Sequence, residues 1–454
     1  MPCPGVLSGL VEVPEPRPSP TIGRLAGSSM DPDVRTWEEC LEFAALSDVG
    51  LRRPNNQDSY ALVLAGTREK FRERGHLLMV ADGMGAHAAG ELASKLATDL
   101  VPLSYDKFLD RPPPEALRAA VQAANEQIHG RGMASDDFRG MGTTTSVLVL
   151  LPQGALAAHV GDSRIYRLRG NRLEQLTFDH SLVWELQAVG QIPADEVPNF
   201  IPKNIITRSL GPNPEVQVDL EGFHPVEPGD TFLLCSDGLS GPVPDDEIAQ
   251  VLATLPPHEA VRSLVDLANL RGGPDNITVI VARATGPLAA PGAGPDAPST
   301  PAPADWPVSS WLLGAAAVFA LAAAFLALVG WRTAAAVGLI AAAGAIGAAL
   351  WHRYGGGGPS QRSDRLGRGP YRSREYPVGN EFVSRLAGLV KELRQATVGT
   401  NWTIDWDPFN DHESRAAHAA QAARHSEAVR EYCQAISFMM AQLRSQQERD
   451  RPRD

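Results

Sequence analysis

The sequence has 454 residues, which is enough for more than one structural unit. Its formal net charge of −12 disfavours a general nucleic-acid-binding role, because such a role needs a basic face. The 4 cysteines include no CxxC pair and no histidine partner at zinc spacing, so neither a disulfide framework nor a zinc site is expected, and a reducing compartment fits better.

Residues 1–40 are predicted to be a disordered, proline-rich extension. The first 29 residues lack the charged-then-apolar pattern of a secretory signal. Prolines recur through the same stretch, at Pro2, Pro4, Pro14, Pro16, Pro18 and Pro20. Met30 is a second candidate for the first residue of the chain.

Residues 41–284 alternate strand-like and helical segments. Two β-hairpins are predicted where turn sequences separate apolar runs, within residues 147–160 and 165–176. Two long helices are predicted from alanine- and leucine-rich helical spacing, at residues 91–103 and 114–129. Strands in hairpins with long helices inserted between them indicate an α+β fold, a sheet sandwich covered by helices.

Residues 285–307 are nearly all Ala, Pro, Gly, Asp and Thr, which predicts a flexible linker. Residues 308–351 are predicted to form two transmembrane helices. The apolar runs 308–329 and 333–350 have no internal charge, and each is near the ~20 residues that span hydrocarbon. Tryptophans mark their ends as an aromatic belt would, at Trp306, Trp311, Trp331 and Trp351. Small residues in the second run would let the two helices pack closely.

Residues 352–379 form a basic stretch directly after this predicted hairpin. The positive-inside rule places the basic side in the cytoplasm, and a hairpin returns the chain to its starting side. We therefore expect a multi-pass protein of the cell (inner) membrane with both flanking regions in the cytoplasm. The arginines of this stretch, Arg353, Arg362, Arg365, Arg368, Arg372 and Arg374, could also contact anionic headgroups. A role as a topology signal is sufficient to explain them.

Residues 380–454 are predicted to form a small helical region. Apolar residues recur there at helical spacing, for example at Phe382, Leu386 and Leu389. The segment from Glu427 to Ile436 is similar to the second helix of a tetratricopeptide unit, but such arrays need several stacked repeats. A small helical bundle is therefore the favoured interpretation.

Four aspartates, Asp58, Asp82, Asp237 and Asp275, each lie at the end of an apolar, strand-like run. A strand fills a core and can then deliver one polar group at its end. A single Asp-Gly or Asp-Asn after such a run is usually only a turn. Four such places, with glycines or an amide beside the acids, predict instead a site for a divalent cation, since Mg²⁺ and Mn²⁺ prefer hard oxygen ligands.

These aspartates belong to a longer ordered series of motifs. The series reads Ser47-Asp48-x-Gly50-x-x-Arg53-x-x-Asn56-Gln57-Asp58, Ala81-Asp82-Gly83-Met84-Gly85, Gly142-Thr143-Thr144, Val160-Gly161-Asp162-Ser163-Arg164, Leu176-Thr177-x-Asp179-His180-Ser181, Thr207-Arg208-Ser209-Leu210-Gly211, Ser236-Asp237-Gly238 and Asp275-Asn276. This series resembles the metal-dependent type 2C serine/threonine protein phosphatases (PPM), in the style of their bacterial members. The resemblance covers residues 41–284 and implies two central antiparallel sheets flanked by helices.

The resemblance also implies two Mn²⁺ or Mg²⁺ ions and a set of ligands. Asp82 would bridge both ions, the Gly83 carbonyl would bind the second, and Asp237 and Asp275 would complete the shell of the first. Asp58 would position water at the metals. Asp162, with Asp237, could hold a weaker third ion, although Gly241 stands where some members have a supporting aspartate.

Two further residues are implied in catalysis. Arg53 is the expected phosphate clamp, because a guanidinium matches two phosphoryl oxygens, whereas its simpler interpretation is a solvated arginine beside Arg52. His87 is implied as the general acid for the leaving seryl or threonyl oxygen, although a lone loop histidine is more often structural.

The sequence therefore predicts a membrane-anchored phosphatase of phosphoserine and phosphothreonine proteins, opposed by a serine/threonine kinase and not bound to nucleic acid. One alternative is a catalytically inactive, phosphatase-like scaffold that binds phosphoproteins. The other is a membrane-tethered adaptor in which the C-terminal helices bind an unknown protein.

Overall fold

The computed structural model describes residues 21–24, 40–86, 88–192, 205–286, 366–397 and 404–450. The chain divides into one compact unit built from Met1–Ala293 and Leu366–Asp454 and a second from Gly294–Arg365. The second unit, which contains most of the predicted linker and the predicted transmembrane helices, lies outside the described residues. None of the helices in the described ranges is long and apolar enough to cross a membrane.

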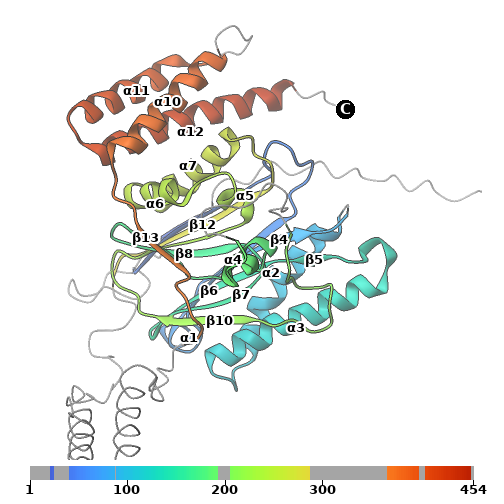
Figure 1. Ribbon diagram of the computed structural model, residues 1–454. Coiled ribbons are helices and arrows are strands. Elements are labelled where there is room, and N and C mark those ends of the chain that lie inside the picture. Colours follow the sequence, from blue (N-terminus) through green and yellow to red (C-terminus); the bar gives the residue numbers. More distant parts are fainter. Residues whose placement is uncertain are drawn as a thin grey trace, which may run out of the picture. The chain divides into compact units, whose positions relative to one another are not determined.

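Two antiparallel sheets form the centre of the first unit (Figure 1). One has seven strands in the order β1 (Thr21–Arg24), β2 (Leu41–Asp48), β12 (Ile277–Ala284), β11 (Thr231–Cys235), β8 (Arg164–Arg169), β9 (Arg172–Gln175) and β13 (Arg372–Glu375). The other has the order β10 (Asp219–His224), β7 (Gly154–Val160), β6 (Thr145–Leu151), β4 (His76–Met84) and β3 (Asp58–Val63), with β5 (Gly142–Thr143) paired to β4. The two predicted hairpins are confirmed as β6–β7 and β8–β9.

Helices α2 (Ala89–Lys107) and α3 (Pro113–Ala134) cover the outer face of one sheet and α6 (Asp245–Thr254) and α7 (Pro257–Leu270) that of the other. Further helices lie in the connections between strands, namely α1 (Arg68–Arg74), the 3₁₀ helix η2 (Asp136–Phe138), α4 (Leu182–Ala188) and α5 (Asp237–Ser240). The C-terminal ones are α10 (Asn380–Thr397), α11 (Trp406–Gln421) and α12 (His425–Asp450). The predicted α+β sandwich with flanking helices is thus present.

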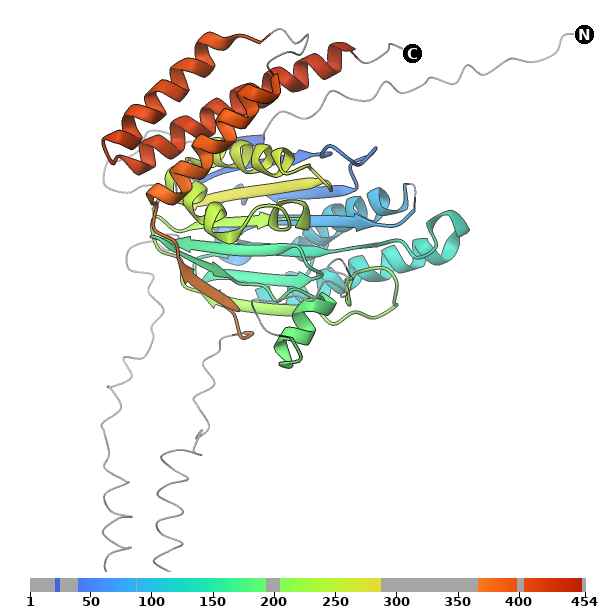
Figure 2. The ribbon, with the colours of Figure 1, turned by 45° about the horizontal axis from the view of Figure 1, so that its top comes forward.

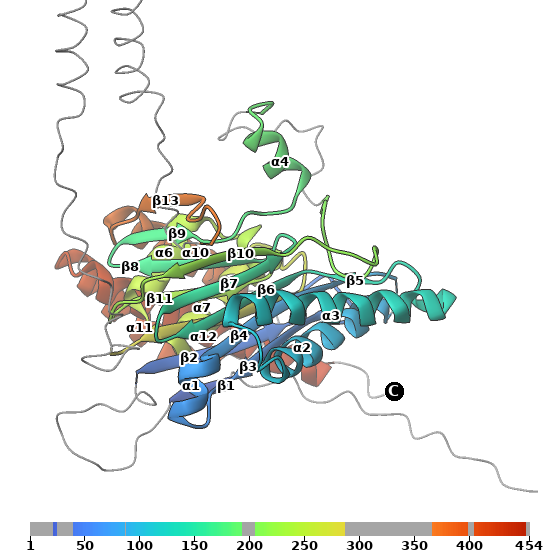
Figure 3. The same ribbon diagram turned by 90° about the horizontal axis from the view of Figure 1, so that it is seen from below.

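Strand alternation separates the apolar side chains into layers. In β4, Leu77 and Met79 face α2 and α3, whereas Leu78 and Val80 face the other sheet. The seven-stranded sheet has its own outer core against α6 and α7. Helix α4 stands away from both sheets (Figure 3).

The aspartates meet at one edge because the sheets are antiparallel. Asp82 lies near the end of β4 and Asp237 follows β11, but Asp58 begins β3 and Asp275 precedes β12. The expectation that all four end a strand is therefore wrong for Asp58 and Asp275. Starts and ends of neighbouring antiparallel strands lie side by side, so the four residues still converge.

The N-terminal extension is not wholly irregular. Within the predicted disordered region 1–40, Thr21–Arg24 forms β1 and pairs antiparallel with β2. Residues 1–20 and 25–39 lie outside the described residues. The pairing covers the edge of β2, which would otherwise expose unpaired backbone groups.

The second half of the predicted juxtamembrane stretch packs on the sandwich instead of standing apart. We call residues 366–379 the strap. Leu366 bridges Gly222 of β10 in one sheet, and β13 then pairs with β9 of the other. The pairing satisfies the edge of β9, which is why this basic segment becomes a strand. Residues 352–365 lie outside the described residues.

The C-terminal helices form the predicted small bundle but not a separate unit. Figures 1 and 2 show α10–α12 against α6 and α7. Phe382 and Leu386 of α10 and Ile436 of α12 share one core with Leu252 of α6 and Val261 of α7. The tail is therefore continuous with the sandwich.

Candidate active site

The carboxylates of Asp58, Asp82, Asp162, Asp237 and Asp275 gather where the two sheets meet, and we call them the acid cluster. Asp58 and Asp82 lie directly opposite each other in the β3–β4 pair. Asp237 follows β11 and Asp275 precedes the neighbouring β12, so they approach from the other sheet. Negative charge on each of Asp58, Asp237, Asp162 and Asp275 affects the pKa of Asp82, which places Asp82 at the centre.

The backbone of Asp82 is held by the Gly-Thr-Thr motif. The Thr143 hydroxyl donates to the Asp82 carbonyl oxygen at 2.9 Å, as does the Thr144 amide. The Asp82 amide in turn donates to the Thr144 hydroxyl at 2.9 Å. All three threonines from Thr143 to Thr145 are fully buried, so this motif fixes where the carboxylate emerges.

Asn276 organises the loop that carries Arg53. Its side-chain amide donates to the carbonyl oxygens of Val49 and Asn55, both at 2.9 Å, and its oxygen accepts from the Gln57 amide at 2.8 Å. One side chain thus satisfies three backbone groups that would otherwise be costly to leave unpaired. The Asp-Asn motif therefore combines a candidate ligand with the residue that shapes the opposite loop.

Gly83 is required by close backbone approach. A Cβ placed there would meet the Gly90 carbonyl oxygen at 2.1 Å and the Gln57 carbonyl oxygen at 2.5 Å. Both distances are too short for any side chain. The residue after Asp82 therefore has only its carbonyl to offer, in agreement with the role that the resemblance implies.

Burial and mutual repulsion make the clustered carboxylates hard to ionise. Burial, opposed by a 2.7 Å hydrogen bond from the Ser236 hydroxyl and aided by Asp237 and Asp275, raises the pKa of Asp58 to about 7. Burial and the charge of Asp237 raise the pKa of Asp162 to about 8. The pKa of Asp82 is also well above its usual range, chiefly through burial. Such a group of acids gains from a cation that neutralises it.

The chemistry of the cluster fits a divalent ion. The Oδ1 atoms of Asp58, Asp162 and Asp237 are buried and accept no hydrogen bond among the described residues. As they stand, no three His, Cys, Asp or Glu side chains in the described part of the chain are arranged to hold an ion together. One oxygen of Asp275 is engaged by Arg53 and one oxygen of Asp58 by Ser236.

Arg53 lies at the cluster, as a phosphate clamp should. Its Nη2 donates to Asp275 Oδ2 at 2.7 Å, and the two side chains are 46% and 30% exposed. The guanidinium therefore reaches the site while remaining open to solvent. His87, the implied general acid, lies outside the described residues.

A buried network extends from Asp162 away from the cluster. Arg164 binds Asp179 through Nε at 2.8 Å and Nη2 at 2.7 Å, and its Nη1 donates to the Tyr166 hydroxyl at 2.8 Å. Tyr166 donates to Asp245 Oδ1 at 3.0 Å. Asp179 is thus paired with Arg164, which gives this residue of the Leu176–Ser181 motif a structural role.

Comparison with known proteins places the chain in a family. The protein phosphatase 2C model matches residues 53–269. Protein phosphatase PhpP of Streptococcus pneumoniae is 40% identical over 245 residues, which make up 53% of this chain and 96% of that protein. Serine/threonine protein phosphatase PstP of Mycobacterium tuberculosis is 40% identical over 245 residues, 53% of this chain and 45% of PstP. A crystal structure of PstP/Ppp shares 38% identity and covers 54% of this chain and 99% of its own, with a TM-score of 0.47.

The chain therefore belongs to the protein phosphatase 2C family. It is a protein serine/threonine phosphatase. A structure of the PstP catalytic domain, 38% identical with a TM-score of 0.45, is described as a complex with two manganese ions.

Sequence reasoning named the acids but not the residues that position them. Ser236 lies within a recognised motif, yet its hydrogen bond to Asp58 spans 178 residues of sequence. Asn276 also belongs to a recognised motif, but its contacts with the Arg53 loop are visible only in the structure. The signal was present in both motifs, but the partners are defined only by the fold.

Proposed function

We propose that this chain hydrolyses phosphoserine and phosphothreonine esters in proteins at a membrane, using two Mn²⁺ or Mg²⁺ ions. The observation that carries the proposal is the convergence of five carboxylates, three of which (Asp58, Asp162 and Asp237) have a buried oxygen that accepts no hydrogen bond among the described residues. Such a group stores unfavourable free energy that a divalent cation relieves.

The acid cluster divides into roles. Asp82 and the Gly83 carbonyl would hold both ions, with Asp237 and Asp275 completing one shell and Asp162 available for a weaker third ion. When bound, the cations supply charge neutralisation and an activated water near neutral pH. Asp58, held by Ser236, orients water at the site.

Arg53 receives the phosphoryl group. Its guanidinium is bound to Asp275 at 2.7 Å, and the same fork suits two phosphoryl oxygens. We assign the general acid to His87 from the family resemblance, to protonate the leaving seryl or threonyl oxygen.

Membrane anchoring is proposed from the sequence of residues 308–350, whose two apolar runs match the hydrocarbon thickness. The catalytic unit and the C-terminal helices would then lie in the cytoplasm, where a serine/threonine kinase opposes the enzyme. The shared core of α10, α12, α6 and α7 argues against an adaptor that acts apart from the phosphatase.

The test uses the full chain purified in detergent, with para-nitrophenyl phosphate as substrate. Activity should require added Mn²⁺ or Mg²⁺ and disappear with a chelator. Asp82→Asn should lower kcat by about a thousandfold or more, because the residue that joins both ions is altered. Asp99→Asn, an exposed acid of α2 paired with Lys95, is the matched control and should behave as wild type. Turnover that persists in chelator would refute the proposal.

A further inference from the structure

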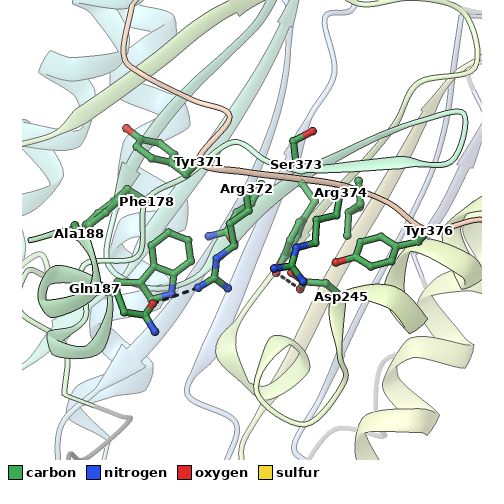
Figure 4. Close-up of a pocket in the computed structure, with 13 residues that line it drawn as sticks. Phe178, Gln187, Ala188, Asp245, Tyr371, Arg372, Ser373, Arg374 and Tyr376 are labelled. Atoms are coloured by element: carbon green, nitrogen blue, oxygen red, sulfur yellow. Dashed lines mark hydrogen bonds between the residues drawn. The ribbon is translucent and has the colours of Figure 1, made fainter. Parts of the chain in front are cut away.

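A cavity of about 490 Å³ opens between the strap and α4 (Figure 4). One wall comes from the strap, including Tyr371, Arg372 and Arg374, and the opposite wall from Trp184 and Gln187 of α4. The cavity therefore joins two segments that are far apart in sequence. Arg372 donates a hydrogen bond to Gln187, 185 residues earlier, at 3.4 Å. No catalytic role in the preceding sections uses these residues.

Aromatic rings and guanidinium groups alternate around this space. The Arg372 guanidinium lies 4.1 Å from the centroid of the Trp184 ring, and Phe178 meets Trp184 edge to face at 5.4 Å. Phe178 also contacts Tyr371, with ring centroids 5.4 Å apart. These stacked contacts hold Arg372 in place, so part of the entropic cost of fixing an arginine around a ligand is already met.

The charge of the cavity favours an anion. Figure 4 shows Arg372 pointing toward Gln187 and Arg374 lying between Asp245 and Tyr376. Both arginines are exposed. The lining acid, Asp245, already accepts a hydrogen bond from Tyr166 and lies 3.9 Å from Arg164. Two accessible cations in a protein of net charge −12 form a local site for a negatively charged group.

The cavity lies within reach of a substrate bound at the acid cluster. Arg372 lies directly opposite Gln175 of β9, and Gln175 lies directly opposite Tyr166 of β8. Arg372 and Tyr166 are therefore two strand spacings apart. Asp162 lies two residues before β8 and four before Tyr166, so Arg372 and Asp162 are roughly 16 Å apart or less, the value for a fully extended chain. An extended polypeptide covers that distance in about five residues.

We propose that this cavity binds an acidic or phosphorylated side chain of the same phosphoprotein, about five residues from the phosphoserine or phosphothreonine being hydrolysed. The inference rests on the phosphatase function proposed above and adds a rule of substrate selection to it. Arg372 is the specificity-determining residue, and Arg374 supports it. Because Arg372 and Arg374 come from the strap, the selection depends on the C-terminal region and not on the sandwich alone.

The experiment measures kcat/KM of the full-length, Mn²⁺-loaded protein in detergent on phosphothreonine peptides. The peptides differ only in a single Glu, Gln or Lys, which is placed in turn at each position up to seven residues before or after the phosphothreonine. Glu near the fifth position on one side should raise kcat/KM over Lys by about fivefold, mainly through KM, as expected for a partly exposed ion pair. A phosphoserine at that position should raise kcat/KM more than Glu does, since it carries more negative charge.

Variants assign the preference to the cavity. Arg372→Glu should abolish or invert the Glu-over-Lys preference, and Arg374→Gln should reduce it. Arg172→Gln is the matched control, because Arg172 is exposed, lies on the neighbouring strand β9 outside the cavity lining, and the change removes a positive charge without placing a like charge opposite Glu375. This control should keep the preference. If Arg372→Glu does not fold, the milder Arg372→Lys should still weaken the advantage of a phosphoserine, since it loses the planar fork.

Distinct results would overturn the inference. A flat profile across all peptide positions, or a preference that survives Arg372→Glu, would remove the cavity from substrate selection. Vesicles of anionic phospholipid that inhibit peptide turnover in wild type but not in Arg372→Glu would assign the cavity to a lipid headgroup instead. Hydrolysis of para-nitrophenyl phosphate is measured in parallel, so loss of the phosphatase function itself is recognised separately.

Discussion

Arg53 and Asp275 form an ion pair at the mouth of the acid cluster, with Nη2 and Oδ2 2.7 Å apart. Each partner has a second candidate role that competes with this contact. Asp275 is a candidate cation ligand, and Arg53 is the candidate phosphate clamp. If Asp275 held a cation, the Arg53 guanidinium would be available to the phosphoryl group. The pair is substantially exposed, so its own contribution to stability is small and exchange of partners costs little.

We therefore expect Arg53→Ala to have two separable effects. KM for para-nitrophenyl phosphate and for phosphopeptides should rise by about tenfold with a smaller change in kcat, since a ground-state phosphate contact is lost. The Mn²⁺ concentration that gives half-maximal activity should fall by a few-fold at most, because Asp275 no longer has a competing partner. Arg52→Ala removes the same charge from the adjacent exposed position and serves as control. Unchanged KM in Arg53→Ala would exclude the clamp.

The ligand acids could be predicted from sequence because each belongs to a short local motif. Asp82 and Asp237 follow apolar runs and precede glycines, a pattern that can be read without the fold. The contacts that orient them could not, since Ser236 meets Asp58 and Asn276 meets Asn55 only after two sheets have packed. Local sequence predicts what a residue can do, whereas its partner depends on long-range pairing.

At the scale of elements, α12 is fastened to α7 by charged contacts as well as by its apolar face. Arg444 Nη1 lies 2.8 Å from Asp266 Oδ1, and the Asp266 side chain is fully buried. Arg430 binds Glu259 at the other end of α7 through Nε at 3.0 Å. Burial outweighs the attraction of Arg444 and raises the pKa of Asp266 to about 6.

This pKa predicts a pH dependence of stability. Because the folded-state pKa lies above the ordinary value of 3.8, the folded protein binds the proton more tightly than the unfolded chain does. The stabilisation is fully present below about pH 4 and is lost as the pH rises through about 6, on the order of 3 kcal/mol in total. Wild type should therefore lose stability relative to Asp266→Asn over this range.

Denaturant unfolding of both proteins between pH 4 and pH 7 measures the difference directly. Asp99→Asn alters an exposed acid on α2 and should track wild type at every pH. Parallel curves for wild type and Asp266→Asn would show that Asp266 titrates at its ordinary value, and would contradict the argument from burial.

Strand β13 could not have been predicted from its own residues. Its sequence, Arg-Ser-Arg-Glu, has no apolar alternation, and all four side chains are exposed. Its strand conformation comes from pairing with β9, together with the hydrogen bond from the Tyr371 amide to the Gln175 carbonyl. The helices of the tail were predictable from apolar spacing, but such spacing shows that a face is buried and not which surface covers it.

At the scale of the whole molecule, the packing of the tail constrains the path of the chain. PhpP is matched over 96% of its length by 53% of this chain, so about half of this protein lies beyond that relative. Part of that remainder, from Leu366 onward, shares a sheet and a core with the catalytic region. Both must therefore lie on the same side of any membrane, and residues 287–365 can cross it only an even number of times.

The sequence of residues 308–350 then favours two crossings over none. Two helices would satisfy every backbone polar group within the hydrocarbon, and the arginine-rich stretch after Trp351 would remain on the side from which translocation is disfavoured. A single crossing, with only the first apolar run inserted, would separate α10–α12 from α6 and α7 and expose their common core. If the first run crosses a membrane, the packing of the tail requires the Ala- and Gly-rich second run, the less apolar of the two, to cross it as well.

Cysteine labelling in intact cells with a membrane-impermeant reagent tests this topology. Cys40, Cys235 and Cys433 are buried, so after Cys3→Ser the background should be low. Single substitutions Pro301→Cys, Arg332→Cys and Gly357→Cys report the linker, the turn and the basic stretch. A hairpin requires that only Arg332→Cys reacts from outside, with all three reacting after lysis. Reaction at Gly357→Cys in intact cells would place the strap across the membrane from β9, and would contradict both the hairpin and the pairing of β13.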